Sequence, residues 1–337
     1  MSWDIVGQDR AVRALKGALA SGRPPHAYLF VGPVGTGKGK LAVLLAQAVN
    51  CTEPEPPCGE CNQCRRIAGR LHADVQVVTL VPREEQRTRD ISIDQVREVE
   101  RSIALKAYEG KQRVIIIDPA EAMSVQAQNA FLKTLEEPPD DVVLVLLTCR
   151  DERLLPTIHS RCRRIEMGLP ARPIIEQALR DRGVAPERAN LLARLCGGRM
   201  GLAIRLSEDP ALVEAREEAL TTAKGLPDEA IRQRFRLAEK LAGLHFRDET
   251  TVAATLDCWR DWWRDLALIQ AGSEEGVINI DRLPDLRREA QRFAQAEVLE
   301  FLHALNRTPL YLQQNINPRL AIEALLLQVP SPDGDVS

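Results

Sequence analysis

The first half of the chain alternates short apolar runs with amphipathic stretches. The apolar runs have the length and the aliphatic and aromatic content of buried strands; they lie at 26–31, 75–80, 114–117 and 142–147. The amphipathic stretches repeat apolar residues every three to four positions and predict helices; they include 41–49, 93–104 and 125–135. Strands that alternate with helices predict an α/β domain with a parallel sheet covered by helices on both faces.

The second half of the chain has a helical pattern throughout. Pro170 and Pro173 mark a boundary, and three short helices are expected before residue 206, ended by Gly183 and the Gly197-Gly198 pair. Longer helices follow, with periodic stretches at 214–224, 229–244, 250–271 and 285–305. The predicted divisions are a domain over 1–169, a three-helix segment over 170–208, an all-helical domain over 209–329 and a frayed tail over 330–337.

Composition narrows the class of protein. Hydrophobic residues make up 45% of the 337 residues and charged residues 28%, which is typical of a soluble globular protein. The N-terminal Met1–Asp4 lacks the basic and apolar regions of a signal peptide, so we expect a cytoplasmic protein. A net charge of −3 argues against a protein that holds DNA alone over its whole surface. Any contact with nucleic acid should be local or shared with partners.

A glycine-rich loop directly follows the first predicted strand. The segment 32–38, GPVGTGK, fits the pattern of a phosphate-binding loop and is followed by a predicted helix. Glycines let backbone N–H groups turn toward phosphate oxygens, and the lysine reaches the outer phosphates. The alternative is an ordinary glycine-rich turn. The candidate nucleotide-binding residues here are Gly32, Gly35, Thr36, Gly37 and Lys38.

Two positions depart from a working ATPase. Gly39 follows Lys38, where a Ser or Thr hydroxyl would bind Mg²⁺. Asp118 ends the strand at 114–117 and fits the metal-holding carboxylate, although a helix cap is a plausible alternative. Pro119 follows it where a glutamate would be needed, and Glu121 is not expected to substitute. Binding of ATP and Mg²⁺ remains possible, with Thr148 as a further candidate contact, but efficient hydrolysis is not expected.

Four cysteines are packed into fourteen residues. Tetrahedral Zn²⁺ needs four soft ligands, and two C-x2-C steps supply them on tight turns; the candidate ligands are Cys51, Cys58, Cys61 and Cys64. With all four positions filled by protein, the metal would be structural. An iron–sulfur cluster and disulfides are the alternatives.

The remaining cysteines and one histidine have less specific interpretations. We expect the scattered cysteines to be small buried apolar residues; they are Cys149, Cys162, Cys196 and Cys258. His72 is a possible fifth ligand, although polar surface is the more ordinary interpretation.

Arginines gather after the strand at 142–147, and most of them fit a solvated basic face. Arg161 differs because it belongs to the motif Ser160-Arg161-Cys162. A guanidinium matches the geometry of phosphate oxygens. If Arg161 is offered to the γ-phosphate of a neighbouring subunit, it would act as an arginine finger in trans.

Several motifs occur in an order that resembles one family. These are Val6–Gln8, His26–Phe30, the GPVGTGK loop, the four-cysteine knot, Asn129–Pro139, Ser160–Cys162 and, near the C-terminus, Asn315–Leu325. Together they resemble bacterial DNA polymerase III clamp-loader subunits of the AAA+ class, most clearly over residues 4–206. The resemblance implies a RecA-like αβα domain, a three-helix lid and a helical collar. It also implies a ring of subunits that loads the sliding clamp onto primer–template DNA.

The departures resemble the delta-prime branch of this family. The tau/gamma motor subunits keep a Ser or Thr, a glutamate and a lid arginine where this chain has Gly39, Pro119 and Gly201, unless Arg199 takes the last role. The resemblance therefore implies a stator-like accessory subunit of DNA-directed DNA polymerase with little or no ATPase activity. Its implied partners are tau/gamma, delta, the sliding clamp and DNA.

Other interpretations remain open from the sequence. The chain could be a catalytically active tau/gamma-like ATPase, or a binding module whose zinc knot grips DNA or protein. Three tryptophans at helical spacing fit a bundle core or a collar interface, with base stacking as the alternative; they are Trp259, Trp262 and Trp263.

Overall fold

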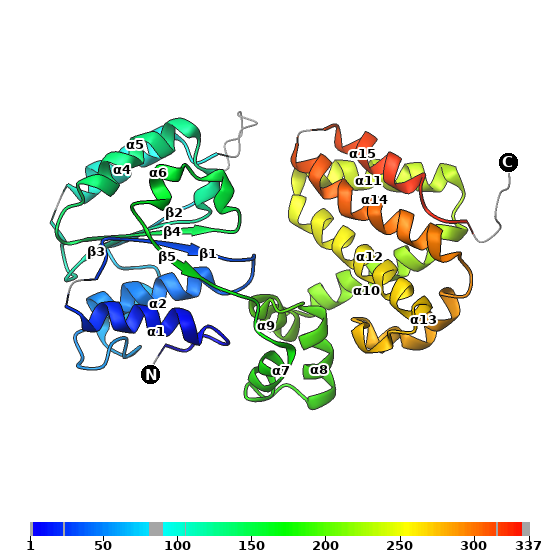
Figure 1. Cartoon of the computed structure of the whole chain (residues 1–337), viewed down its shortest axis with the longest axis horizontal. Coiled ribbons are helices and arrows are strands. Elements are labelled where there is room, and N and C mark those ends of the chain that lie inside the picture. The colour runs from blue at the N-terminus through cyan, green and yellow to red at the C-terminus, as the bar shows by residue number, and fades with distance from the viewer. Residues whose placement is uncertain (1–2, 23, 81–89, 105, 315, 332–337) are drawn as a thin grey trace. The chain divides into compact units, whose positions relative to one another are not determined.

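The computed structural model of the chain describes residues 3–22, 24–80, 90–104, 106–314 and 316–331 (Figure 1). The chain divides into two compact units, one made of Met1–Arg182 with Cys196–Leu202 and the other of Gly183–Leu195 with Ala203–Ser337. The division at 169 and 208 therefore stays a prediction, and most of the expected frayed tail lies outside the described residues. None of the helices in the described ranges has the length and apolar character to cross a bilayer.

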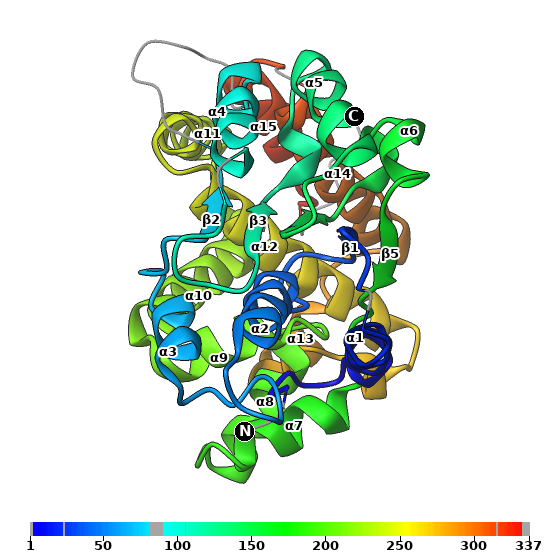
Figure 2. The same cartoon turned by 90° about the vertical axis from the view of Figure 1, so that its left-hand side faces the viewer.

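The first unit is built on a parallel sheet of five strands in the order β2-β3-β4-β1-β5, which Figure 2 shows from β2 to β5. The strands are β1 Ala27–Val31, β2 Val75–Val78, β3 Arg113–Ile117, β4 Val142–Thr148 and β5 Arg163–Glu166. The predicted α/β class is confirmed. The pattern did not predict β5, because this edge strand buries Ile165 and exposes its other three residues.

Helices cover both faces of the sheet (Figure 1). On one face, Tyr28 and Phe30 of β1 belong to a core that includes residues of α1 Asp9–Ala20, α2 Lys38–Asn50 and α3 Asn62–Ala68. On the other face, Ala27 and Leu29 join a core with α4 Ile93–Ile103, α5 Val125–Glu136 and α6 Pro156–His159. Successive strand residues point to opposite faces, so the continuous apolar runs serve both cores at once.

The parallel strands bring distant motifs to one edge of the sheet. The carboxyl ends of β1, β3 and β4 lie at the same edge, so the loop after Val31 meets Asp118 and Thr148. Helix α2 then crosses the sheet and delivers Cys51 to the opposite edge, where the strands begin. The phosphate loop and the cysteine knot are thereby placed at opposite ends of α2.

Three short helices follow the sheet, as predicted. They are α7 Arg172–Arg180, α8 Pro186–Leu195 and α9 Met200–Glu208. The expected glycine stops are confirmed, because Gly183, Gly197 and Gly198 all have positive φ, at 85°, 53° and 88°.

The second unit contains a bundle of helices around one hydrophobic core. The α-helices that follow α9 are α10 Pro210–Gly225, α11 Ile231–Arg247, α12 Glu249–Gln270, α13 Leu283–Glu289, α14 Gln295–Gln313 and α15 Pro318–Leu326. The prediction of one helix over 285–305 is wrong, because the chain turns between α13 and α14. Gln270 Nε2 donates to the carbonyls of Ala290 and Phe293, both at 2.9 Å, and so satisfies groups that a continuous helix would have bonded internally.

The three tryptophans of α12 form part of this core. Their exposed fractions are 0% for Trp259, 2% for Trp262 and 0% for Trp263, so they cannot stack on bases in this fold. Trp259 Nε1 donates to the carbonyl of Ala219 at 3.0 Å, and Trp263 packs edge-to-face on Phe301 with ring centroids 4.8 Å apart. The interpretation as bundle core is confirmed.

Candidate nucleotide and metal sites

The phosphate loop joins β1 to α2 and depends on two glycines. A Cβ at Gly32 would lie 2.2 Å from the carbonyl oxygen of Met167, so a side chain does not fit there. Gly37 is the N-cap of α2 with φ at 93°, a conformation that other residues rarely adopt. No side chain caps this helix start, which leaves its first N–H groups directed to the loop. The arrangement is suited to an anion.

Lys38 lies against its own loop. Its Nζ donates to the carbonyls of Gly32 and Pro33 at 2.7 and 2.9 Å. Burial lowers the pKa of Lys38, while nearby acidic groups, including Asp118 and Glu121, oppose this shift. Burial also raises the pKa of the Asp118 carboxyl, with Lys38 acting in the opposite direction. The lysine and the aspartate therefore form one electrostatic site at the carboxyl edge of the sheet.

Gly39 faces the carboxylate that would hold a metal. A Cβ built at Gly39 would have Asp118 Oδ2 at 3.9 Å as its nearest neighbour. A serine or threonine at this position would thus direct its hydroxyl to the same place as the carboxylate. The assignment of Asp118 to a metal site stays a prediction, and Gly39 supplies no hydroxyl beside it.

Glu121 is engaged with the end of β4. Its Oε1 accepts from the backbone N–H of Cys149 at 3.2 Å and from the Cys149 thiol at 2.8 Å. Burial alone would raise the pKa of Glu121, but hydrogen bonds from Cys149 and Thr148 outweigh it and lower the pKa. The carboxylate is thus held by β4.

The prediction that Cys149 is a buried apolar residue is wrong, because Cys149 is exposed. Its neighbour Thr148 is buried, and the Thr148 hydroxyl accepts from the N–H of Arg150 at 3.0 Å. Sequence reasoning missed the pairing of Cys149 with Glu121. The available signal was that Cys149 follows a strand whose end lies at the same sheet edge as Asp118.

The start of α9 lies against the phosphate loop. The N–H of Gly201 donates to the carbonyl of Gly35 at 3.2 Å. The Cβ of Arg199 would be 3.0 Å from a Cβ built on Gly35. Arg199 and Gly201, the two candidates for the lid arginine position, therefore both lie next to the phosphate loop. Gly201 contacts the loop through its backbone.

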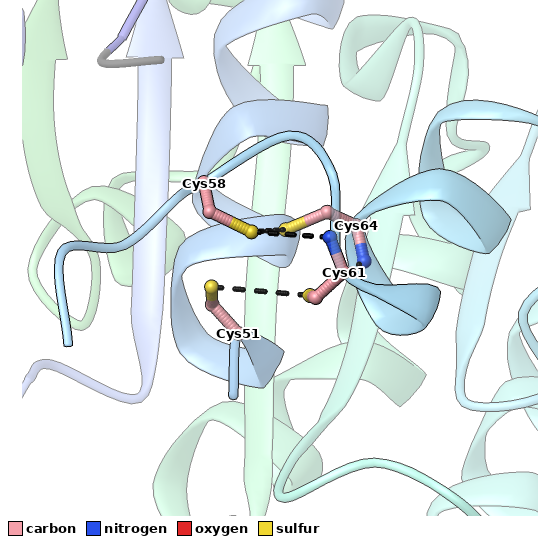
Figure 3. A group of neighbouring side chains, drawn as sticks. All are labelled: Cys51, Cys58, Cys61 and Cys64. Atoms are coloured by element: carbon pink, nitrogen blue, oxygen red, sulfur yellow. Dashed lines mark hydrogen bonds between the residues drawn. The ribbon is translucent and has the colours of Figure 1, made fainter. Parts of the chain in front are cut away.

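The four knot cysteines converge on one point (Figure 3). All four Sγ atoms lie within 4.8 Å of one another, with Cys51 to Cys61 at 4.0 Å and Cys58 to Cys64 at 3.9 Å. Tetrahedral zinc with Zn–S bonds of about 2.3 Å separates its sulfurs by about 3.8 Å. The donor set and its spacing therefore fit a zinc ion, and the cluster could hold such a metal.

The local backbone supports thiolates in the knot. The N–H of Cys61 donates to Cys58 Sγ at 3.2 Å, and the N–H of Cys64 donates to Cys61 Sγ at 3.4 Å. Burial acts to raise the pKa of Cys61, but hydrogen bonds from Thr52 and Cys64 outweigh it and lower the pKa to about 6. Thiolates are the ligand form of cysteine, and these donors favour that form at Cys61, whereas burial raises the pKa of Cys64.

His72 supports the knot but does not join it. The side chain is buried, so the prediction of polar surface is wrong. Its Nε2 lies 2.6 Å from Gln63 Oε1 on α3, and its Nδ1 accepts from the N–H of Asp74. Asp74 in turn accepts three backbone N–H groups, each at 2.8 Å, from Tyr108, Glu109 and Gly110. This network fixes α3 to the start of the sheet.

Arg161 follows the short helix α6 on the surface of the first unit. Its side chain is 32% exposed, and its Nη2 lies 2.6 Å from Glu136 Oε1 at the end of α5. Its Nη1 donates to the carbonyl of Thr157 at 3.0 Å. None of these contacts involves the chain's own phosphate loop. The structure therefore presents a guanidinium whose carboxylate partner is itself half exposed.

Comparison with known proteins gives the family. A family model described as "DNA polymerase III, delta subunit" matches residues 7–170. The delta' subunit of Bacillus subtilis (strain 168) is 30% identical, and the match covers 98% of each chain. The chain belongs to the delta-prime family of DNA polymerase III subunits. The delta' subunit of Pseudomonas aeruginosa PAO1 is 33% identical over 92% of this chain and 93% of that protein.

The chain is also similar to tau subunits of DNA polymerase III. The tau subunit of B. subtilis is 27% identical over 97% of this chain and 61% of its own length. A gamma subunit-related protein from Thermotoga maritima aligns over 95% of this chain with 18% identity and a TM-score of 0.45. The predicted membership of the clamp-loader family and the role in DNA replication are confirmed.

Proposed function

We propose that the chain is the stator-like subunit of a clamp loader and hydrolyses little or no ATP itself. It would assemble with tau/gamma motor subunits and with delta, and it would lend Arg161 to a neighbouring subunit. The relatives named tau, gamma/tau and delta' support a shared complex. Through that complex the chain would act in the cytoplasm, where the sliding clamp is loaded onto primed DNA.

The geometry around Asp118 carries this proposal. The position that faces Asp118 Oδ2 is Gly39, which offers no hydroxyl to Mg²⁺. The residue after Asp118 is Pro119, and the carboxylate of Glu121 is bonded to Cys149. Phosphoryl transfer depends on metal electrostatics and on a positioned water. The site lacks the hydroxyl that would help to hold the metal, and it lacks the glutamate that would position the water.

The same site keeps what nucleotide binding needs. The loop retains its glycine geometry, and Lys38 would exchange two carbonyl partners for phosphate oxygens. Gly32, Gly35, Thr36 and Gly37 would contribute backbone groups, and Asp118 and Thr148 would border the outer phosphates. We infer that ATP binds here as a structural ligand, because binding and hydrolysis depend on different parts of the site.

The knot would hold its zinc through Cys51, Cys58, Cys61 and Cys64. A bound zinc with four protein thiolates has no open coordination position, so it would supply cross-linking and no catalysis. Side chains outside the knot connect it to the rest of the first unit. Gln47 Nε2 donates to the carbonyl of Cys64 at 2.8 Å, which ties the knot to α2. A knot built in this way would keep a loop of fourteen residues in one conformation.

Arg161 is the group that would act on a neighbour. Its ion pair with Glu136 is solvent-exposed, and such pairs contribute about 0–1 kcal/mol. A triphosphate carries more negative charge than one carboxylate, so the guanidinium would favour the phosphate when a neighbouring site is within reach. Exchanging Glu136 for a phosphate would therefore destabilise the fold only slightly. A residue that acts in trans must be able to leave its own partner in this way.

Arg161→Ala in a loader reconstituted with tau/gamma and delta tests the proposal. An arginine finger contributes about 10³–10⁵-fold to turnover at the site that receives it. The variant complex should therefore lose the ATP turnover of the one site that receives Arg161. Assembly of the complex, measured by gel filtration, should be unchanged. Arg172→Ala, at another exposed arginine, is the matched control and should leave turnover unchanged. Equal turnover in the Arg161→Ala and control complexes would contradict the proposal.

The rival function is an active tau/gamma-like motor. Purified chain with Mg-ATP separates the two, because sustained hydrolysis that Lys38→Ala abolishes would favour the motor. We expect nucleotide binding without such turnover, since Gly39 and Pro119 are both present.

A further inference from the structure

A groove of about 1110 Å³ lies between the cysteine knot and the N-terminal part of the first unit. One side is formed by Trp3 and the end of α1, and the other by the segment that links Cys51 to Cys58 and by residues up to Cys61. We call this the knot groove. The residues that line the knot groove do not include any of the phosphate loop 32–38.

Apolar residues line the knot groove on both sides. Trp3, Leu19 and Ala20 line it from one side, and Pro54 and Pro56 line it from the other. Trp3 is 7% exposed and packed in the core, so this side is a fixed surface. The two prolines are exposed and limit the backbone freedom of the opposite wall. The groove therefore presents apolar surface on both of its sides.

The rim of the knot groove is acidic. Glu53, Glu55 and Glu60 line it, and all three are exposed, while Lys16 is its one basic lining residue. The side chains of Glu55 and Glu60 make no hydrogen bond or ion pair with any residue in the described ranges. Four thiolates around a divalent zinc would add a formal charge of about −2 beside them. The groove thus combines apolar surface with a surplus of negative charge.

The acidic wall is tied to the metal ligands at both ends. Glu53 to Pro56 lie between Cys51 and Cys58, and Glu60 precedes Cys61. A metal bound to those cysteines would fix the ends of this short loop and thereby the positions of its carboxylates. The knot would then have a function besides stabilising its own loop. This inference rests on the zinc assignment made above.

We propose that the knot groove docks a lysine- or arginine-rich segment of another polypeptide that carries an apolar anchor side chain. The carboxylates would pair with the basic side chains, and the anchor would lie on Trp3 and Leu19. DNA and anionic lipid do not fit, because their phosphates would face three glutamates.

The test uses the full chain and a fluorescein-labelled twelve-residue peptide of alternating lysine and serine with two leucines at its centre. Fluorescence anisotropy gives its affinity at low and at physiological salt. Two control peptides replace lysine by glutamate or leucine by serine. The variant Glu53→Gln, Glu55→Gln, Glu60→Gln removes the acidic rim. The matched variant Glu214→Gln, Glu218→Gln, Glu300→Gln removes three exposed charges from the other unit.

We expect the rim variant to bind the lysine–leucine peptide about tenfold more weakly than the parent and the matched variant, because three exposed ion pairs are lost. Both control peptides should bind more weakly than the test peptide. Chelation of the metal, verified by metal analysis, should also weaken binding, and full affinity without metal would overturn the role given to the knot.

Equal affinity of the rim and matched variants, or equal binding of the glutamate peptide, would overturn the proposal. Self-association of the chain that the rim variant abolishes, without peptide binding, would assign the groove to a second copy and also overturn it. These results are independent of Arg161 and of ATP turnover, so they are distinguishable from a failure of the proposed function.

Discussion

Restoring a hydroxyl at position 39 tests whether the nucleotide site lacks one metal ligand. A Cβ at Gly39 meets nothing closer than Asp118 Oδ2 at 3.9 Å, so both Gly39→Ser and Gly39→Ala fit without a clash. Gly39 is the second residue of α2 and its φ is not positive. The two variants differ by a single oxygen atom, which makes alanine the matched control for serine.

The stability of the two variants follows from helix propensity. Glycine is about 0.5–1 kcal/mol less favourable than alanine inside a helix, and serine lies between them. We therefore expect both variants to raise the free energy of unfolding of the first unit, with alanine raising it by up to about 1 kcal/mol. Urea denaturation measures this. A loss of stability in either variant would mean that the space beside Asp118 is not open.

The affinity for nucleotide should separate the variants in the opposite order. A hydrogen bond or ligand contact to a charged group contributes about 1.5–3 kcal/mol, which is tenfold or more in affinity. Gly39→Ser should bind a fluorescent ATP analogue at least about tenfold more tightly than Gly39→Ala with Mg²⁺, and equally with EDTA. Hydrolysis should stay low because Pro119 remains. Equal affinities in Mg²⁺ would refute the assignment of Asp118 to a metal site.

Three further predictions concern the elements that hold the site. Asp74 is 1% exposed and accepts three backbone N–H groups and Arg113, so Asp74→Asn should lower the free energy of unfolding by about 3 kcal/mol in urea denaturation at pH 7. Burial acts to raise the pKa of Asp74, but the hydrogen bonds from Tyr108, Glu109 and Gly110 outweigh it and lower the pKa. Its contribution is therefore complete above about pH 4, the unfolded value, and is lost as the pH falls through the lowered folded pKa; a parent and an Asp74→Asn chain with the same acid profile would contradict this. Cys64→Ser should abolish stoichiometric zinc, measured by metal analysis, and lower the thermal stability of the first unit, whereas Cys258→Ser in the other unit should retain the metal. Trp263→Ala should cost the helical bundle about 3–5 kcal/mol, because the ring is fully buried against Phe293 and Phe301; a loss below about 1 kcal/mol would place the ring outside the core.

Features that are local in the chain could be predicted from the sequence alone. The strand, loop and helix around Lys38 are contiguous, so the motif contains its own structural context. The four knot cysteines lie within fourteen residues, and such short spacing allows the thiols to meet through local turns. The glycine stops at Gly183 and Gly198 follow from backbone sterics at single residues. Each of these features could be predicted because its main determinants are neighbours in the sequence.

The tertiary structure decided what depends on groups far apart in the chain. Glu121 is held at β4 by a hydrogen bond from Cys149, 28 residues away. The helix expected over 285–305 is interrupted where Gln270 donates hydrogen bonds to two of the carbonyls in that segment. Arg161 meets Glu136, and Trp3 meets the acidic loop of the knot, only after the chain has folded. A local pattern records the preferences of neighbouring residues, but buried polar groups choose their partners by geometry, because leaving one unpaired costs more than breaking a local preference. The sequence therefore determined the family, the parallel sheet and the four cysteines that could hold a metal, and packing decided which charges face each other and which surfaces remain open.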